Sequence, residues 1–185
     1  MQRKKHIFLV VLCLVLTCSS FAQETPSAQA VVKEATTQAS VKNKQVFLVF
    51  HASWCGWCHM MDSLLTKTPL AKTFNKHFVL VHITIMEQKP ERRKDENPGG
   101  MDLFAQYGGS SNAGIPYWVV LDKDGKCLAN SRMKGATEDL TGNNGDNTGC
   151  PGEPQEVAYF TTVLKQAAHF SSKEIEEVKE VFGKK

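Results

Sequence analysis

The feature that most constrains this chain is the uninterrupted apolar segment Val-Phe-Leu-Val-Phe at residues 46–50. β-Branched and aromatic residues favour a strand, and the lack of alternating polar residues indicates that both faces of the strand are buried. The strand leads into residues 55–66, where Met61, Leu64 and Leu65 are spaced to share one face of a helix. Because such a strand needs cover on both sides of its sheet, the segment predicts an α/β fold.

Later segments continue this pattern of strands and helices. Further strands are predicted at residues 78–85, 117–121 and 127–133, and further helices at 101–107 and 153–182. The last two strands form a hairpin around an Asp-Lys-Asp-Gly turn, and the last helix breaks near Ser171 and Ser172. This order predicts a small mixed sheet with helices on both faces.

Less regular segments flank and interrupt these elements. Residues 23–43 are rich in Ala, Thr and Gln, and we interpret them as an N-terminal helix or linker whose helix reaches about Ala39. The folded domain is expected over residues 44–185. Polar, glycine-rich sequence predicts insertions in this domain near residues 87–100 and 137–152.

The N-terminus has the pattern of a secretory signal peptide. Basic residues at positions 3–5 precede an apolar run at 7–17, which is too short to span a bilayer comfortably. Small residues then occupy the two positions that a signal peptidase reads, which predicts cleavage after Ala22. We therefore interpret residues 1–22 as a signal peptide and expect a periplasmic or extracellular protein with no stable membrane span after cleavage. An uncleaved N-terminal anchor and a chain lipid-modified at Cys18 are the alternatives.

Charge and cysteine content narrow the class of the mature chain. Cleavage removes three basic residues and no acidic one, which leaves 19 basic and 19 acidic residues. This balance argues against a nucleic-acid partner, because such a protein needs a basic stripe. The densest charged stretch, residues 87–96, mixes both signs and is predicted to be a solvated loop. Four cysteines remain after cleavage, and an oxidising compartment permits disulfides between them.

The chemistry of the chain centres on Ser-Trp-Cys-Gly-Trp-Cys-His at residues 53–59, where the first strand ends and a helix begins. The N-terminus of a helix presents unpaired N–H groups and the positive end of its dipole, and both stabilise a thiolate on Cys55. Cys58 lies one turn further on, so the two sulfurs can meet in a small ring. This arrangement predicts that Cys55 attacks a substrate disulfide and that Cys58 resolves the mixed disulfide.

A second motif, Gly-Ile-Pro-Tyr at residues 114–117, precedes the third strand. A proline cannot donate to a strand ladder and is therefore expected at the start of a strand. The peptide bond between Ile115 and Pro116 is a candidate for the cis form, since it lies in a tight connection.

Together these motifs resemble the thioredoxin family. Residues 54–58 resemble the Trp-Cys-Gly-Pro-Cys active site of thioredoxins, and residues 114–116 resemble their cis-proline loop. Lys-Gly-Ala at 134–136 looks like the glycine turn before the last helix of that family. The resemblance covers about residues 46–170 and implies the thioredoxin fold, with a central mixed sheet flanked by helices on both faces.

The resemblance also implies roles for particular residues. Cys55 and Cys58 would be the catalytic nucleophile and the resolving thiol, and a substrate groove would lie beside Ile115 and Pro116. Typical thioredoxins carry a buried aspartate, thought to relay protons, where this chain has Val49. The relay is then absent or supplied by another group, for which His51, His59 and Asp62 are the candidates. In addition, Trp57 replaces the proline between the cysteines, and Ser63 replaces a helix-kinking proline.

Other residues near the motif have weaker assignments. We expect Trp54 and Trp57 to form an apolar docking surface for extended substrates, although core packing is the usual role of such residues. His59 is a candidate for lowering the pKa of the Cys55 thiol as an imidazolium, with a solvated surface position as the alternative. Cys127 and Cys150 lie outside the motif and are predicted to form a structural disulfide, with two separate thiols as the alternative.

These observations predict a thiol–disulfide oxidoreductase that acts on protein disulfides in the cell envelope, together with a redox partner. No cofactor or metal is expected. Cys55, Cys58 and His59 also match the attachment signature of c-type haem, so a haem-binding protein is one alternative. A redox-inactive binding module with the same fold is another. The direction of exchange depends on the reduction potential and the electron partner, so reduction, oxidation and isomerisation all stay open.

Overall fold

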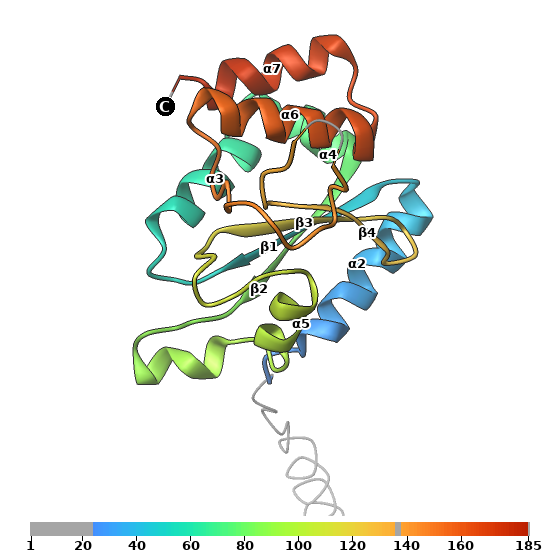
Figure 1. Cartoon of the computed structure of the whole chain (residues 1–185). Coiled ribbons are helices and arrows are strands. Elements are labelled where there is room, and N and C mark those ends of the chain that lie inside the picture. The colour runs from blue at the N-terminus through green and yellow to red at the C-terminus, as the bar shows by residue number, and fades with distance from the viewer. Residues whose placement is uncertain (1–23, 136–137, 185) are drawn as a thin grey trace, which may run out of the picture.

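A computed structural model describes residues 24–135 and 138–184 of the chain (Figure 1). The expected signal peptide at 1–22 and Ala136 of the predicted glycine turn lie outside the described residues. The centre of the molecule is a four-stranded sheet in the order β2-β1-β3-β4. Among the described residues, no helix has the length and apolar character needed to cross a membrane.

The sheet is mixed, as predicted. β1 (Gln45–His51) pairs in parallel with β2 (Phe78–Thr84) and antiparallel with β3 (Tyr117–Leu121), which in turn pairs antiparallel with β4 (Cys127–Asn130). All five residues of the apolar run at 46–50 are buried, which accounts for the absence of alternation in this strand. β1 is an inner strand of the sheet. Its carboxyl end, and the motif that follows, therefore lie between the ends of the neighbouring strands β2 and β3.

Helices cover both faces of this sheet (Figure 1). One face packs against α3 (Gly56–Thr66), α4 (Leu70–His77), α6 (Pro154–Ala168) and α7 (Ser172–Phe182). The other face packs against α2 (Ala28–Lys42) and α5 (Gly100–Gln106). The prediction of an α/β fold, with a central mixed sheet and helices on both faces, is confirmed.

Alternation along β1 divides the core into two parts. Phe47 and Val49 point into the layer with α6 and α7, where the ring of Phe47 contacts Phe74, Phe78, Trp118 and Phe160. Val46, Leu48 and Phe50 point into the layer with α2 and α5. Successive side chains of a strand face opposite sides of the sheet, so one apolar run supplies both cores.

The N-terminal helix α2 belongs to the packed body. The Ser27 side chain caps it by accepting a hydrogen bond from the backbone N–H of Ala30 at 3.2 Å. Its buried face consists of the small residues Ala28, Ala35 and Ala39, which let the helix approach β1 and β2 closely. The helix ends at Lys42, one turn beyond the predicted end.

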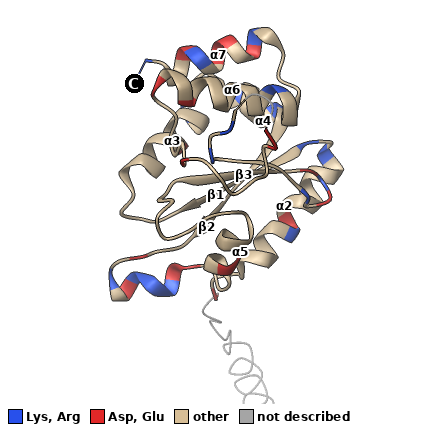
Figure 2. Ribbon diagram, viewed as in Figure 1, with Lys and Arg blue, Asp and Glu red and all other residues tan. Residues whose placement is uncertain are grey.

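Several elements differ from the sequence-based expectation. α4 was not predicted, because its eight residues make only about two turns, which is too short a stretch to recognise a helical period in the sequence. β4 ends at Asn130 rather than at 133, and residues 131–133 instead pair antiparallel with residues 146–148. The charged insertion contains a short 3₁₀ helix, η1 (Pro90–Asp95), none of whose residues is buried. Figure 2 shows the mixed charges of η1 and of α7 on the outside of the molecule.

Candidate active site

Cys55 and Cys58 form a disulfide at the start of α3, with an S–S distance of 2.05 Å and 5.2 Å between their α-carbons. Cys55 is the N-cap residue of the helix, and its sulfur accepts a hydrogen bond from the backbone N–H of Cys58 at 3.2 Å. Both residues are 4% exposed. The sulfur of Cys55 thus occupies the position where free N–H groups and the helix dipole stabilise negative charge.

The local sequence explains this placement. β1 ends at His51, and a tight turn follows in which the Cys55 N–H donates to the carbonyl of Ala52 at 3.1 Å. The backbone of Cys55 is extended, with φ −82° and ψ 98°, and helical conformation begins at Gly56. Only four residues therefore separate the end of β1 from the start of α3, which places the cysteine pair at the carboxyl end of this buried strand.

The loop before β3 lies against the disulfide. The peptide bond between Ile115 and Pro116 is cis, and the Ile115 carbonyl oxygen is 3.5 Å from the sulfur of Cys55. The side chain of Ile115 packs on the small buried cluster of Ala52, Cys55 and Cys58. Gly114 has a φ of +72°, a conformation that glycine adopts without a steric cost.

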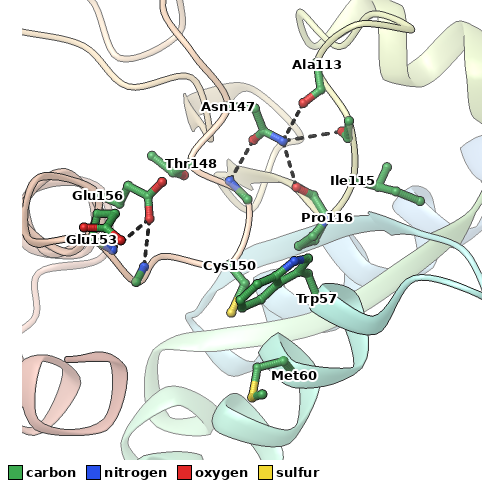
Figure 3. A pocket seen from close by; sticks show the side chains of 13 residues that line it. Trp57, Met60, Ala113, Ile115, Pro116, Asn147, Thr148, Cys150, Glu153 and Glu156 are labelled. Atoms are coloured by element: carbon green, nitrogen blue, oxygen red, sulfur yellow. Dashed lines mark hydrogen bonds between the residues drawn. The ribbon is translucent and has the colours of Figure 1, made fainter. Parts of the chain in front are cut away.

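A groove of about 510 Å³ lies beside the disulfide (Figure 3). Trp57 and Met60 of α3 line one side, and the two residues are 62% and 42% exposed. Ile115 and Pro116 also line it, as expected for a substrate groove. The opposite wall comes from the insertion between β4 and α6 and from the first turn of α6. Its residues include Asn147, Thr148, Cys150, Glu153 and Glu156.

Trp54 does not line this groove. It lies in a separate hollow with Ser53, Glu87 and Arg92, and its indole N–H donates to the carbonyl of Met86 at 2.7 Å. Trp54 and Trp57 therefore belong to different surfaces, which corrects the expectation that they form one docking surface.

Glu87 corrects the expectation that residues 87–96 are solvated throughout. Glu87 is 5% exposed, and its two carboxylate oxygens accept hydrogen bonds of 2.7 Å from the N–H and the hydroxyl of Ser53. Burial favours the protonated acid, but the hydrogen bonds from Ser53 and the nearby charge of Arg92 outweigh it and lower the pKa of Glu87. A buried carboxylate thus holds the turn that precedes Cys55.

A polar cluster lies on the same side of β1 as Val49. The rings of His51 and His82 are 5.0 Å apart, and His82 Nε2 is 3.4 Å from a carboxylate oxygen of Asp62. Burial, together with His82 and His59 nearby, lowers the pKa of His51 to about 4. Burial likewise lowers the pKa of His82, although the charge of Asp62 opposes this. Two of the three candidate relay groups therefore lie in one cluster, with His82 as a member that the sequence did not indicate.

His59 lies apart from the sulfur of Cys55. Its Nε2 is 2.9 Å from the carbonyl oxygen of Ser53, which can only accept, so this nitrogen carries the proton. The ring is exposed and links the first turn of α3 to the turn before it.

The predicted disulfide between Cys127 and Cys150 is wrong in this structure, where Cys55–Cys58 is the one disulfide of the described residues. Cys127 packs in the layer with α2, and Cys150 packs in the layer with α6. The sheet lies between the two layers, and neither cysteine is in a disulfide. Figure 3 shows Cys150 in the groove beside Trp57. Within residues 24–135 and 138–184, no group of three or more His, Cys, Asp or Glu side chains is arranged to hold a metal ion.

Comparison with known families agrees with this geometry. The model of a family described as thioredoxin-like matches residues 27–123, which is more than half of the chain. The chain belongs to the thioredoxin-like family. It has the fold of a thioredoxin-like thiol–disulfide oxidoreductase, with a Cys-x-x-Cys disulfide at the expected place. The match includes α2, so the N-terminal helix is part of the family pattern.

The chain is similar to several solved structures, among them the following three. A disulphide isomerase from Xylella fastidiosa Temecula1 is 28% identical, with a TM-score of 0.46, over 60% of this chain and 77% of that chain. A DsbH oxidoreductase is 24% identical, with a TM-score of 0.45, over 78% and 83% of the two chains. The oxidised C-terminal domain of DsbD from Neisseria meningitidis is 24% identical, with a TM-score of 0.37, over 56% and 81%. Comparison with curated proteins gave no match.

Sequence reasoning did not identify three residues that shape the site. Glu87 was grouped with exposed charges, His82 with an apolar strand, and Asn147 with a glycine-rich loop. Each of these residues contacts segments that are distant in the sequence, and a local sequence pattern does not reveal such contacts. The sequence offered a signal for His82 alone. This histidine lies in a strand that was expected to be buried, and a buried polar residue needs a hydrogen-bond partner.

Proposed function

We propose that this protein catalyses thiol–disulfide exchange on protein substrates in the cell envelope. The observation that carries the proposal is the position of the Cys55 sulfur. It caps α3, faces the Ile115 carbonyl at 3.5 Å and lies beside the groove that Trp57 lines. A nucleophile, a site that stabilises its anion and a surface for the substrate therefore meet at one point.

The reaction follows from this arrangement. In the reduced protein, the Cys55 thiolate attacks one sulfur of a substrate disulfide, forms a mixed disulfide and releases the other substrate sulfur as a thiolate. The Cys58 thiolate then attacks the Cys55 sulfur, which restores the Cys55–Cys58 disulfide and releases the second substrate thiolate. The substrate gains two electrons and the cysteine pair loses two. The same steps in reverse oxidise a substrate dithiol.

The groove favours a polypeptide over a small thiol. Its volume of about 510 Å³ is lined by exposed Trp57 and Met60 on one side and by residues of the insertion and of the first turn of α6 on the other. Exposed aromatic and methionine side chains bind apolar segments of variable sequence. This combination suits an extended segment of a substrate protein.

The proposed location rests on the N-terminal sequence. Residues 1–22 have the charge, length and small residues of a cleaved signal, and an oxidising compartment supplies substrate disulfides. The intact mass of the protein recovered from an expressing cell tests this. A mature chain beginning at Gln23 in the exported fraction supports the proposal, and an uncleaved chain contradicts it.

The catalytic proposal is tested by exchange assays with matched cysteine variants. Cys55→Ala is expected to abolish reduction of a protein disulfide, whereas Cys58→Ala is expected to accumulate a mixed disulfide that mass spectrometry detects. Cys127→Ala is the control, because Cys127 lies in the layer with α2, away from the groove. Wild-type activity in Cys55→Ala, or faster alkylation of Cys58 than of Cys55 at neutral pH, would overturn the assignment.

The same preparation distinguishes the alternatives. Both motif sulfurs are joined to each other here, as an exchange centre requires, whereas c-type haem attachment uses both sulfurs in bonds to the haem. The absorption spectrum of the purified protein tests this point, since a haem protein is red. A redox-inactive binding module would leave both a protein disulfide and glutathione disulfide unreduced.

A further inference from the structure

The insertion between β4 and α6 is fastened to the sheet by main-chain hydrogen bonds. The Met133 N–H donates to the carbonyl of Asp146 at 2.8 Å, and the Thr148 N–H donates to the carbonyl of Ser131 at 2.8 Å. These bonds make residues 146–148 a short antiparallel extension of the β4 edge, with Asn147 at its centre. Residues 146–148 therefore form a wall whose position relative to the sheet is fixed.

Asn147 connects this wall to the loop that faces the disulfide (Figure 3). Its side-chain NH₂ donates to the carbonyl of Ala113 at 2.9 Å and to the carbonyl of Pro116 at 3.0 Å, with Gly114 O at 3.4 Å. Its side-chain oxygen accepts a hydrogen bond from the N–H of Gly149 at 3.1 Å. One amide group thus holds carbonyls on both sides of Ile115.

The backbone of Ile115 itself is left open by this arrangement. Its carbonyl faces the Cys55 sulfur at 3.5 Å, and within the described residues its N–H has no hydrogen-bond partner. A backbone donor and acceptor that project from a rigid loop can pair with an extended peptide as a strand does. The position of the Ile115 N–H and carbonyl therefore depends on the groups that hold the carbonyls on either side of Ile115.

Other residues strengthen the wall without touching this loop. The Trp118 indole N–H donates to the carbonyl of Gly149 at 3.0 Å, and the Thr148 hydroxyl donates to the carbonyl of Ser131 at 3.0 Å. Arg132 donates to the carbonyls of Gly108 and Gly145 at 2.7 and 2.8 Å. Since these bonds keep the insertion in place, loss of the Asn147 side chain is expected to release the loop more than the wall.

We propose that Asn147 is a positioning residue for substrate binding, which fixes the loop at 113–116 so that Ile115 can pair with an extended segment of a substrate protein. The inference rests on the proposed exchange function and adds a determinant of substrate preference to it. A peptide or protein disulfide needs the Ile115 backbone, whereas a small aromatic disulfide needs mainly access to the Cys55 sulfur. Loss of the Asn147 side chain is therefore expected to change KM for a peptide or protein disulfide more than it changes the rate with a small aromatic disulfide.

The test compares two substrates in two variants. Asn147→Ala removes the donors, and Asn147→Asp keeps the shape while it replaces the NH₂ by an acceptor oxygen that repels the carbonyls. For a disulfide-bonded peptide, we expect KM to rise at least about fivefold in both variants, because hydrogen bonds worth about 1 kcal/mol each are lost from the loop. The rate with a small aromatic disulfide is expected to fall by a clearly smaller factor.

Asn144→Ala is the matched control. It lies in the same insertion but contacts Glu138 and does not line the groove, so both substrates are expected to react as with wild type. Circular dichroism and melting temperature verify that each variant is folded, and Asn147→Asp serves if Asn147→Ala does not fold. Equal losses with both substrates, or no change in KM for the peptide, would overturn the proposal. If wild-type protein reduces neither substrate, the proposed function itself fails.

Discussion

His82 stands directly opposite Val49 in the parallel register of β1 and β2, and its Nε2 lies 3.4 Å from a carboxylate oxygen of Asp62. The resemblance to thioredoxins places a buried aspartate where this chain has Val49, and His82 of β2 lies beside this position and contacts Asp62 of α3. Asp62 lies four residues beyond Cys58 on α3, one turn along the same face of the helix. The pair therefore lies on the same side of α3 as the resolving cysteine, one turn along the helix.

We predict that His82 assists deprotonation of Cys58 in the resolving step. Burial lowers the pKa of His82, so its ring is neutral at neutral pH and can accept a proton. His82→Gln should slow release of the mixed disulfide by about a hundredfold, the lower end of what a positioned general base contributes. Stopped-flow measurement of this step against pH provides the test. The control is His77→Gln, a histidine on α4 that pairs with Glu174. Identical pH profiles for His82→Gln and wild type would contradict the prediction.

His51 is expected to make stability depend on pH. Its pKa is lowered from 6.5 to about 4 by burial and by His82 and His59, with the opposing charges of Glu87 and Asp62 too weak to cancel this. Between these two values the unfolded chain binds a proton that the folded chain excludes. The free energy of unfolding should therefore fall as the pH decreases from about 6.5 to about 4. Urea denaturation across this range measures the slope.

His51→Gln is the variant that isolates this contribution. It removes the titrating ring, so its stability should change less with pH than that of wild type over the same range. The carboxylate of Glu174, whose pKa is lowered chiefly by the hydrogen bond from Lys76, is present in both proteins and does not affect the comparison. Parallel pH slopes for the two proteins would show that His51 is not the source.

Glu87 should stabilise the turn before Cys55. Glu87→Gln keeps the size of the side chain but loses the charge that accepts both hydrogen bonds from Ser53. Charge-assisted hydrogen bonds contribute about 1.5–3 kcal/mol, so we expect unfolding free energy to drop by about 2 kcal/mol at pH 7. The lowered pKa of Glu87 means that this contribution is present above its ordinary pKa and is lost as the pH falls below it. Glu91→Gln on exposed η1 is the control, and an equal effect there would refute the prediction.

The fold could be predicted largely because its signals are local. The apolar run at 46–50, the hairpin turn before β4 and the serine before the last helix each act through neighbouring residues, and each appears in the structure. The position of the cysteine pair could be predicted for the same reason, because only four residues separate the end of β1 from the start of α3. Helix α4 lacked such a signal and is held by Phe74, whose ring packs against Phe47 and Phe78.

The remainder of the site depends on contacts that no local pattern contains. Glu87 meets Ser53 across 34 positions, and Asn147 meets Ala113 across 34 positions. Both residues lie in polar insertions, where composition indicates solvent exposure on average. The mistaken disulfide has a similar origin, because an even number of cysteines says nothing about which face of the sheet each one occupies.

The last prediction concerns the two cysteines outside the motif. Cys127 packs in the layer with α2, and burial raises the pKa of its thiol to about 11 from an ordinary value of 9.0. The thiolate is the reactive form, so iodoacetamide at pH 8 should label Cys127 about a hundredfold more slowly in the folded protein than in guanidinium chloride. Mass mapping of the oxidised, non-reduced protein should find the Cys55–Cys58 bridge and no peptide that joins Cys127 to Cys150. A linked peptide of that kind would mean that the insertion crosses to the other face of the sheet, and rapid labelling of folded Cys127 would show that its thiol is not buried.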